Sequence, residues 1–178
     1  MKIGIAGTGG IGSNVAALLA RSGIQQFKLV DFDRVDGSNL NRQFYFHDQI
    51  GSVKVDVLAE NLLRIAPEIQ IERVQVRLNA GNLMAVFDDC NAVVEGLDGR
   101  SSKKLLIEAL APSGRLIVSA SGVAGSRLED IETRRMGSCV IIGDFHTDAA
   151  RARCYAPKVS VVAAMMAHVI LDQGGYYA

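Results

Sequence analysis

Short apolar runs alternate with amphipathic stretches along most of this 178-residue chain. A run of about four to eight apolar residues predicts a buried strand, and apolar residues at every third or fourth position predict a helix. Strands are expected at residues 2–6, 27–30, 69–78, 92–94 and 116–119, and helices at residues 11–23, 55–67, 82–87 and 101–110. This alternation predicts an α/β fold, in which a mostly parallel, doubly wound sheet carries helices on both faces.

The strand–helix rhythm changes after Arg127. Residues 131–135 and 139–142 are expected to form two short strands around Gly137, with no helix between them. Consecutive strands joined in this way run antiparallel. The sequence therefore predicts an antiparallel edge of the sheet near the C-terminus.

The C-terminal segment contains a polar stretch and then an apolar one. Residues 144–157 are expected to be an irregular loop, and residues 159–171 are apolar almost all round, which predicts a buried closing helix with His168 in the core. The hydrophobic content of 49% suits a chain with one sizeable core. A single domain spanning residues 1–178 is expected.

Charge and cysteine content argue against several classes of protein. Lys and Arg together number 19, as do Asp and Glu, so no net charge draws the chain to nucleic acid or to an anionic membrane. No apolar stretch reaches membrane-spanning length and no signal-peptide pattern is present, which predicts a cytoplasmic protein. Cys90, Cys139 and Cys154 form no CxxC pair, so neither a disulfide framework nor a zinc site is expected.

A glycine-rich loop, GTGGIG at residues 7–12, separates the first expected strand from the first expected helix. The pattern GxGxxG in this context predicts a Rossmann-like fold whose helix N-terminus binds a phosphate, although a turn used only for close packing has the same pattern. Asp31 ends the next strand, nineteen positions after Gly12, where an acidic side chain accepts hydrogen bonds from ribose hydroxyls. A cap on the following turn is the alternative role for Asp31.

The polar stretch that follows Asp31 favours ATP over a dinucleotide. It brings Arg42 and Lys54 into the connection that leaves the second strand, and a simple dehydrogenase has little use for them. Lys54 falls in the first turn of a helix, where the macrodipole disfavours a cation unless an anion is close. A polyphosphate would supply that anion. The alternative is that both residues are solvated surface cations.

Four motifs together resemble the ThiF/MoeB family of ubiquitin-activating-type adenylyltransferases, over most of the chain. They are GxGGxG at residues 7–12, the DxD of Asp31 and Asp33, SNLNRQ at residues 38–43 and the Gly-x-x-Lys that ends at Lys54. The resemblance implies an enzyme that binds ATP and Mg2+ and adenylylates the C-terminal glycine of a ubiquitin-like sulfur-carrier protein ending in Gly-Gly, with release of pyrophosphate. It also implies a homodimer.

The resemblance implies a role for each matching residue. Nucleotide contacts are implied for Gly7, Gly9, Gly10, Gly12, Asp31, Asp33, Asn39, Arg42, Gln43 and Lys54. Arg42, Lys54 and Asp98 would be catalytic. The two cations would stabilise charge on the α-phosphate and on departing pyrophosphate, and Asp98 would bind Mg2+, for which one carboxylate and the phosphates suffice. An N-cap of the helix that starts near Ser101 is the alternative role for Asp98.

The sequence departs from the family pattern at three places, and these departures point to one subgroup of the family. The chain lacks the two zinc-binding CxxC pairs and the preceding arginine-bearing helix of longer relatives, and Gly99 stands where family members commonly have Asn. These features resemble the short ThiF form of thiamin pathways, which implies thiazole biosynthesis. Gly122, Ala124 and Gly125 would let an extended carrier tail approach the nucleotide, although a plain strand-exit turn explains them equally well.

Two alternative functions stay open. An NAD-dependent oxidoreductase is supported by the glycine loop and Asp31 alone, and it leaves Arg42 and Lys54 without a role. A non-catalytic ATP-binding partner subunit is supported by the missing arginine-bearing helix. A sulfur-transfer role for Cys154 is weaker than an incidental loop thiol.

Overall fold

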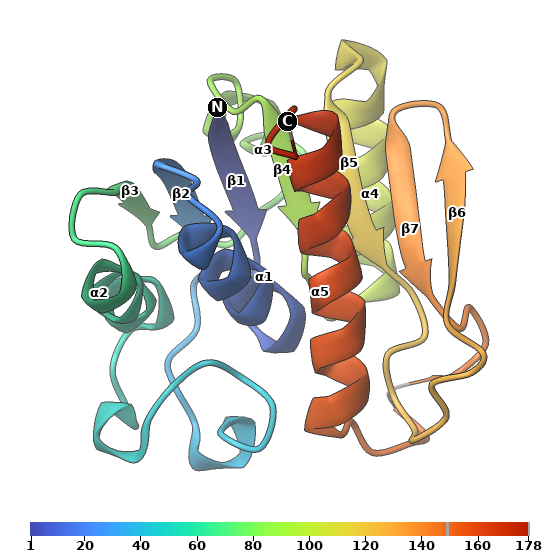
Figure 1. Cartoon of the computed structure of the whole chain (residues 1–178), viewed down its shortest axis with the longest axis horizontal. Coiled ribbons are helices and arrows are strands. Elements are labelled where there is room, and N and C mark those ends of the chain that lie inside the picture. Colours follow the sequence, from blue (N-terminus) through green and yellow to red (C-terminus); the bar gives the residue numbers. More distant parts are fainter. Residues whose placement is uncertain (149, 178) are drawn as a thin grey trace.

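The strands of this computed structural model, which describes residues 1–148 and 150–177, form one seven-stranded sheet in the order β3-β2-β1-β4-β5-β7-β6 (Figure 1). The strands are β1 (Lys2–Ala6), β2 (Gln26–Val30), β3 (Gln70–Val74), β4 (Ala92–Glu95), β5 (Leu116–Ala120), β6 (Glu132–Met136) and β7 (Cys139–Gly143). The helices are α1 (Gly10–Arg21), α2 (Lys54–Ile65), α3 (Leu83–Val86), α4 (Arg100–Leu110) and α5 (Ala156–Gln173). Short 3-10 helices are η1 (Gly37–Asn39), η2 (His47–Gln49) and η3 (Ala111–Ser113).

The sheet is parallel except at one edge. β1 pairs in parallel with β2 and with β4, and β6 is antiparallel to β7 at the end of the sheet. The hairpin between β7 and β6 turns at Gly137, whose φ of +58° lies in the left-handed region that suits glycine. The predicted α/β fold with a mostly parallel sheet and an antiparallel C-terminal edge is therefore confirmed.

Helices cover both faces of the sheet, with α1, α2 and α5 on one face and α3 and α4 on the other (Figure 1). Neighbouring residues of a strand point to opposite faces, so Leu29 belongs to the core under α1 and Val30 to the core under α4. Because both faces are covered, the central strands are apolar along nearly their whole length. This coverage is why they stand out in the sequence as short apolar runs.

β3 is shorter than the alternation at residues 69–78 predicted. The strand ends at Val74, because the N–H of Val76 donates to the carbonyl of Val74 and turns the chain away from β2. The apolar residues Val76 and Leu78 then line a cavity and do not extend the sheet. The next helix is also short, since α3 spans only Leu83–Val86.

The closing helix begins three residues earlier than expected, at Ala156, with Pro157 in its first turn. A proline is tolerated there because the amide that it lacks would have no partner inside the helix. The prediction that His168 lies in the core is wrong. Its side chain is exposed, and its Nδ1 lies 3.1 Å from the hydroxyl of Tyr177. Among the described residues, none of the helices has the length and apolarity that crossing a membrane requires.

Candidate functional site

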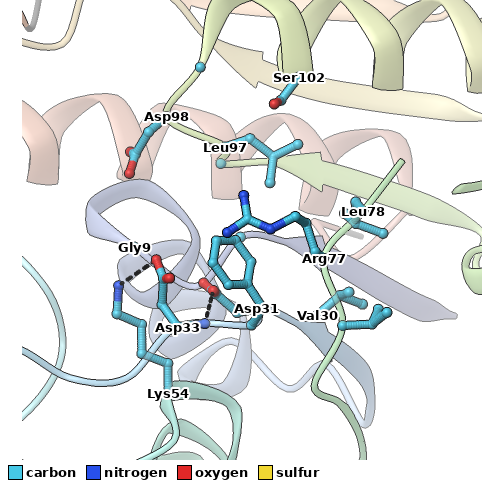
Figure 2. A pocket seen from close by; sticks show the side chains of 15 residues that line it. Gly9, Val30, Asp31, Asp33, Lys54, Arg77, Leu78, Leu97, Asp98 and Ser102 are labelled. Carbon is cyan, nitrogen blue, oxygen red and sulfur yellow. Dashed lines mark hydrogen bonds and ion pairs between the residues drawn. The ribbon is translucent and has the colours of Figure 1, made fainter. Parts of the chain in front are cut away.

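A cavity of about 370 Å³ opens where β1, β2, β3 and β4 end (Figure 2). The strand order reverses between β1 and β4, and open α/β sheets bind ligands at the carboxyl ends of their strands at such a point. Of the residues predicted from the sequence, the cavity is lined by Gly7, Gly9, Asp31, Asp33, Lys54 and Asp98. The predicted residues Gly10, Gly12, Asn39, Arg42 and Gln43 are not among its lining residues.

The glycine loop combines close packing with an open helix end. A Cβ on Gly12 would lie 1.9 Å from the carbonyl oxygen of Gly7, and Gly96 at the end of β4 closes on the same atoms. Gly12 therefore serves packing, which is the alternative that the sequence left open. α1 starts at Gly10 with Gly9 as its N-cap and no side-chain cap, so the N–H groups of its first turn are available to a ligand.

Asp31 joins the glycine loop to the end of β2. Its Oδ2 accepts hydrogen bonds from the backbone N–H of Thr8 at 2.7 Å and from the Thr8 hydroxyl at 3.0 Å. Its Oδ1 accepts from the N–H of Asp33 at 2.9 Å, which is the turn-capping role. A carboxylate offers about four acceptor positions, so Asp31 can still accept from a hydroxyl in the cavity.

Lys54 is a buried cation with a loose partner. It is the first residue of α2, and its side chain is only 7% exposed. Its Nζ lies 3.7 Å from Oδ2 of Asp33 and makes no hydrogen bond to any residue that the structure describes. The first turn of a helix disfavours a positive charge, so this ammonium is poorly compensated as it stands. Figure 2 shows it facing the cavity beside Asp33.

The SNLNRQ segment lies next to the glycine loop, outside the cavity wall. The Arg42 guanidinium donates to the carbonyl of Ser38 at 3.2 Å and to Oδ1 of Asn41 at 2.7 Å, while its aliphatic stem passes Gly10. Asn39 completes a capping box with Asp36.

Gln43 faces Gly9 through its Nε2, which lies 3.8 Å from the position of a Cβ there. Its Oε1 is buried without a hydrogen-bond partner among the described residues. Such an atom is costly to leave unsatisfied, which is consistent with a polar ligand beside the glycine loop.

Three contacts that the sequence did not reveal attach residues 42–45, at and just after the end of the SNLNRQ segment, to the glycine loop and α1. The Tyr45 hydroxyl donates to the carbonyl of Thr8 at 2.8 Å, and burial raises the pKa of this phenol well above its ordinary value. The Ser13 hydroxyl accepts from the N–H of Phe44 at 3.0 Å, and Nδ2 of Asn14 donates to the carbonyl of Arg42 at 2.8 Å. An isolated Ser, Asn or Tyr carries no local pattern that predicts such contacts.

Asp98 is exposed on the turn between β4 and α4, and its carboxylate makes no hydrogen bond or ion pair with the residues that the structure describes. The N-cap of α4 is Gly99, so the alternative role of Asp98 as the helix cap is wrong. The described chain brings no three His, Cys, Asp or Glu side chains together as a metal cluster. One free carboxylate at the cavity nevertheless fits Mg2+, which binds proteins through one or two carboxylates and takes its other ligands from phosphates and water.

Glu95, at the end of β4, fixes the turn that carries Asp98. This carboxylate is fully buried, and it accepts hydrogen bonds from the N–H of Leu97 at 2.7 Å, from Nζ of Lys103 at 2.9 Å and from the hydroxyl of Ser119 at 2.6 Å. A buried charge is stable only when its partners are complete, so Glu95 makes the turn rigid.

The far wall of the cavity is apolar and was not predicted. It consists of Val76 and Leu78 after β3 and of Leu97 after β4, with Phe32 and Arg77 beside them. The alternation of residues 69–78 is typical of one continuous strand, which would put these side chains in the sheet. The cavity thus has a polar end at the glycine loop and an apolar end at residues 76–78.

Comparison with known proteins identifies the family. A family model described as the ThiF family matches residues 1–172. The chain belongs to the ThiF family. Among curated ThiF relatives, the adenylyltransferase and sulfurtransferase UBA4 of Saccharomyces cerevisiae is 30% identical over 141 residues, which are 78% of this chain and 32% of UBA4. This chain therefore spans about a third of the length of UBA4.

Solved structures of similar fold cover nearly the whole chain. The E. coli tRNA N6-threonylcarbamoyladenosine dehydratase TcdA, in complex with ATP, has a TM-score of 0.85 at 19% identity and covers 99% of this chain and 88% of its own. E. coli MccB with ATP has a TM-score of 0.78 at 24% identity and covers 98% of this chain and 56% of its own. At these identities the likeness shows that the fold is shared.

Proposed function

We propose that this ThiF-family chain binds Mg2+-ATP in the cavity and adenylylates the C-terminal carboxylate of a ubiquitin-like sulfur carrier. The observation that carries the proposal is Lys54, a buried ammonium at the cavity whose ion-pair partner lies 3.7 Å away. A triphosphate would complete its neutralisation. Asp98, the free carboxylate across the cavity, supplies the complementary metal ligand.

The order of chemical groups around the cavity matches the order of groups in ATP. The phosphates would lie at the N-terminus of α1 and at Lys54, and the ribose at Asp31 and Asp33. The base would lie against the apolar wall. TcdA and MccB, which have the same fold, were both solved with ATP.

The reaction needs no protein nucleophile. A carboxylate oxygen of the carrier attacks the α-phosphorus, the bond from that phosphorus to the bridging oxygen of pyrophosphate breaks, and an acyl-adenylate and pyrophosphate result. The chain holds the two reactants in line and stabilises the charge that builds up on the phosphate oxygens. Lys54 would stabilise the transferring phosphate directly. Asp98 would hold Mg2+, which when bound offsets charge on the same oxygens.

Arg42 would have to turn toward the cavity to share this role. Its guanidinium is held by one carbonyl and one amide oxygen, which belong to the exposed residues Ser38 and Asn41. Both acceptors are uncharged oxygens, and a guanidinium binds a charged phosphate more strongly, so a phosphate would displace them.

The nature of the acceptor is inferred from the names of relatives. UBA4 is an adenylyltransferase and sulfurtransferase, and MccB was solved with MccA. These names favour a protein or peptide carboxylate as the acceptor. Within that class we infer a ThiS-like carrier ending in Gly-Gly, acting in thiamin thiazole biosynthesis, and a homodimeric enzyme.

Pyrophosphate exchange tests the reaction. With Mg2+-ATP, labelled pyrophosphate and a ThiS-like carrier ending in Gly-Gly, we expect label to appear in ATP, because the adenylylation step is reversible. A carrier without its terminal glycines is the control and should give no label. Absence of exchange with every carrier of this class, despite ATP binding, would favour a non-catalytic ATP-binding subunit.

Titration calorimetry separates the remaining alternative. We expect the chain to bind Mg2+-ATP and to give no heat with NAD, because a triphosphate brings more negative charge to Lys54 than the pyrophosphate of NAD does and also brings the metal that Asp98 would bind. Binding of NAD without binding of ATP would restore the NAD-dependent oxidoreductase.

A further inference from the structure

Arg77 and Phe32 form a stacked pair at the apolar end of the cavity. The guanidinium carbon of Arg77 lies 3.7 Å from the centre of the Phe32 ring, and both residues line the cavity. They come from the segments that follow two adjacent parallel strands, β3 and β2. Figure 2 shows the Arg77 side chain reaching across the cavity, between the end of β2 at Asp31 and Leu97 on the opposite side.

No carboxylate among the described residues holds this arginine. They give Arg77 no ion pair within 4 Å and no hydrogen bond from its guanidinium, so Phe32 is the contact that orients it. Phe32 is itself 40% exposed, which is unusual for a large apolar side chain. A guanidinium is flat and weakly hydrated, and it stacks on rings through either face. One face of Arg77 rests on Phe32, and a second ring in the cavity would stack on the other face.

The position of Arg77 in the cavity indicates which part of a ligand could supply the second ring. The phosphate end of the cavity is defined by Gly9 and Lys54, and the ribose position by Asp31. Arg77 lies beyond Asp31, between Val76 and Leu78 of the apolar wall, where the ligand has no charge to neutralise. A planar group with a π-face is the chemistry that an apolar wall and a stacked guanidinium recognise together.

We propose that Arg77, held flat by Phe32, stacks on the nucleobase of the bound nucleotide and is a specificity-determining residue for purines. The proposal rests on the proposed function, because it takes ATP as the occupant of the cavity. A purine offers a larger π-face than a pyrimidine and gains more from the stack. Arg77 contributes to base binding and leaves phosphate binding to Lys54 and the glycine loop.

Three variants separate stacking from charge. Arg77→Ala is expected to weaken binding of ATP and of adenosine by the same factor, roughly tenfold for the loss of one stacking partner. Arg77→Lys keeps the charge but lacks the flat face, so it should lose nearly as much as Arg77→Ala. Phe32→Leu should lose less, since it removes only the support. Arg73→Ala removes an arginine of β3 that pairs with Asp56 and does not line the cavity, and it is the matched control.

Titration calorimetry of each variant with adenosine, cytidine, Mg2+-ATP and Mg2+-triphosphate is the test, with melting temperatures to show that each variant folds. Equal losses for adenosine and ATP, with triphosphate binding unchanged and a smaller preference for adenosine over cytidine, support the proposal. An unchanged preference for adenosine over cytidine in Arg77→Ala overturns the assignment of specificity to Arg77. Losses for ATP and triphosphate with adenosine unchanged overturn it in favour of a phosphate contact. Unchanged or tighter binding by Arg77→Ala also overturns it. A wild-type chain that binds neither adenosine nor ATP contradicts the proposed function as well, which keeps the two failures distinct.

Discussion

Gly12 leaves no room for a side chain, because its missing Cβ would lie 1.9 Å from the backbone oxygen of Gly7. The Gly12→Ala variant must displace backbone at the start of α1, and we expect it to lose about 1–3 kcal/mol of unfolding free energy together with ATP binding. Gly10→Ala is the matched control for the fold. Its nearest atom would lie 3.5 Å away, and alanine favours the helix. Chemical denaturation of both variants measures the difference, and equal stability would contradict the close-packing role.

Lys54 is expected to support catalysis at some cost to the stability of the fold. The Lys54→Ala variant is expected to slow pyrophosphate exchange by about 10²-fold, which is typical for loss of one preorganised charge at a transferring group. Its melting temperature should stay level or rise, because a poorly compensated buried charge is removed. Lys104→Ala is the control, since Lys104 is exposed on α4 and pairs with Glu108. Full activity in Lys54→Ala would remove this residue from the catalytic set.

At the scale of elements, one buried ion pair joins β7 to α5 beyond the nucleotide cavity. Nζ of Lys158 lies 2.6 Å from Oδ2 of Asp144 and donates to the carbonyl of Ala124 at 2.8 Å. The two side chains are 1% and 2% exposed. The pair therefore links the segments that follow β5 and β7 to the first turn of α5. From the sequence, these segments were predicted only as a glycine-containing turn and a polar loop.

Removal of one partner of this pair should be costly. The Lys158→Met variant leaves the Asp144 charge buried and unpaired, and we expect a loss of about 3–5 kcal/mol of unfolding free energy. The double variant Asp144→Asn with Lys158→Met should recover part of that loss, because no buried charge remains and asparagine can still accept from the N–H of Thr147. A double-mutant cycle by denaturation measures this, and additive losses would contradict a direct coupling.

The same pair predicts a pH dependence. Burial alone would raise the pKa of Asp144, but hydrogen bonds from Lys158 and Thr147 outweigh burial and hold the pKa well below its usual range. A carboxyl whose pKa is depressed in the folded state stabilises the fold above its unfolded pKa of about 3.9, and that stability is lost as the pH falls. We expect Asp144→Asn to flatten the decline of melting temperature below about pH 5. An identical decline in the variant would show that Asp144 does not titrate in this way.

Prediction from the sequence succeeded for features that depend on a single strand or helix. The apolar runs of β1, β2 and β4 are continuous because both sheet faces are covered, and the residues that follow such strands converge at one edge. The pattern of strands and helices was therefore enough to bring Asp31 and Lys54 to this edge. The alternation of residues 69–78 predicted one strand, and the turn at Val76, which ends the strand at Val74 and leaves an apolar wall after it, has no signal in that alternation.

At the scale of the whole molecule, the contacts that escape sequence reasoning are those between distant segments. Tyr45 bonds to Thr8 across 37 positions and Ser119 to Glu95 across 24, and neither pair has a local pattern. The position of Arg42 depends on the contacts of residues 42–45 with Thr8, Ser13 and Asn14, so its role stays a prediction while the cavity itself is defined. The order of the strands places the cavity, and contacts between distant segments position the residues around its opening.

The most direct measurement is the intact mass of the carrier after incubation with the protein, Mg2+ and ATP labelled at the α-phosphate. We expect the carrier to gain one AMP at its C-terminal glycine, with the label retained. We expect no gain for a carrier without that glycine, and a much slower gain with the Lys54→Ala variant. ATP binding with no AMP on any carrier of this class, or transfer that is independent of the terminal carboxylate, would contradict adenylylation at this site.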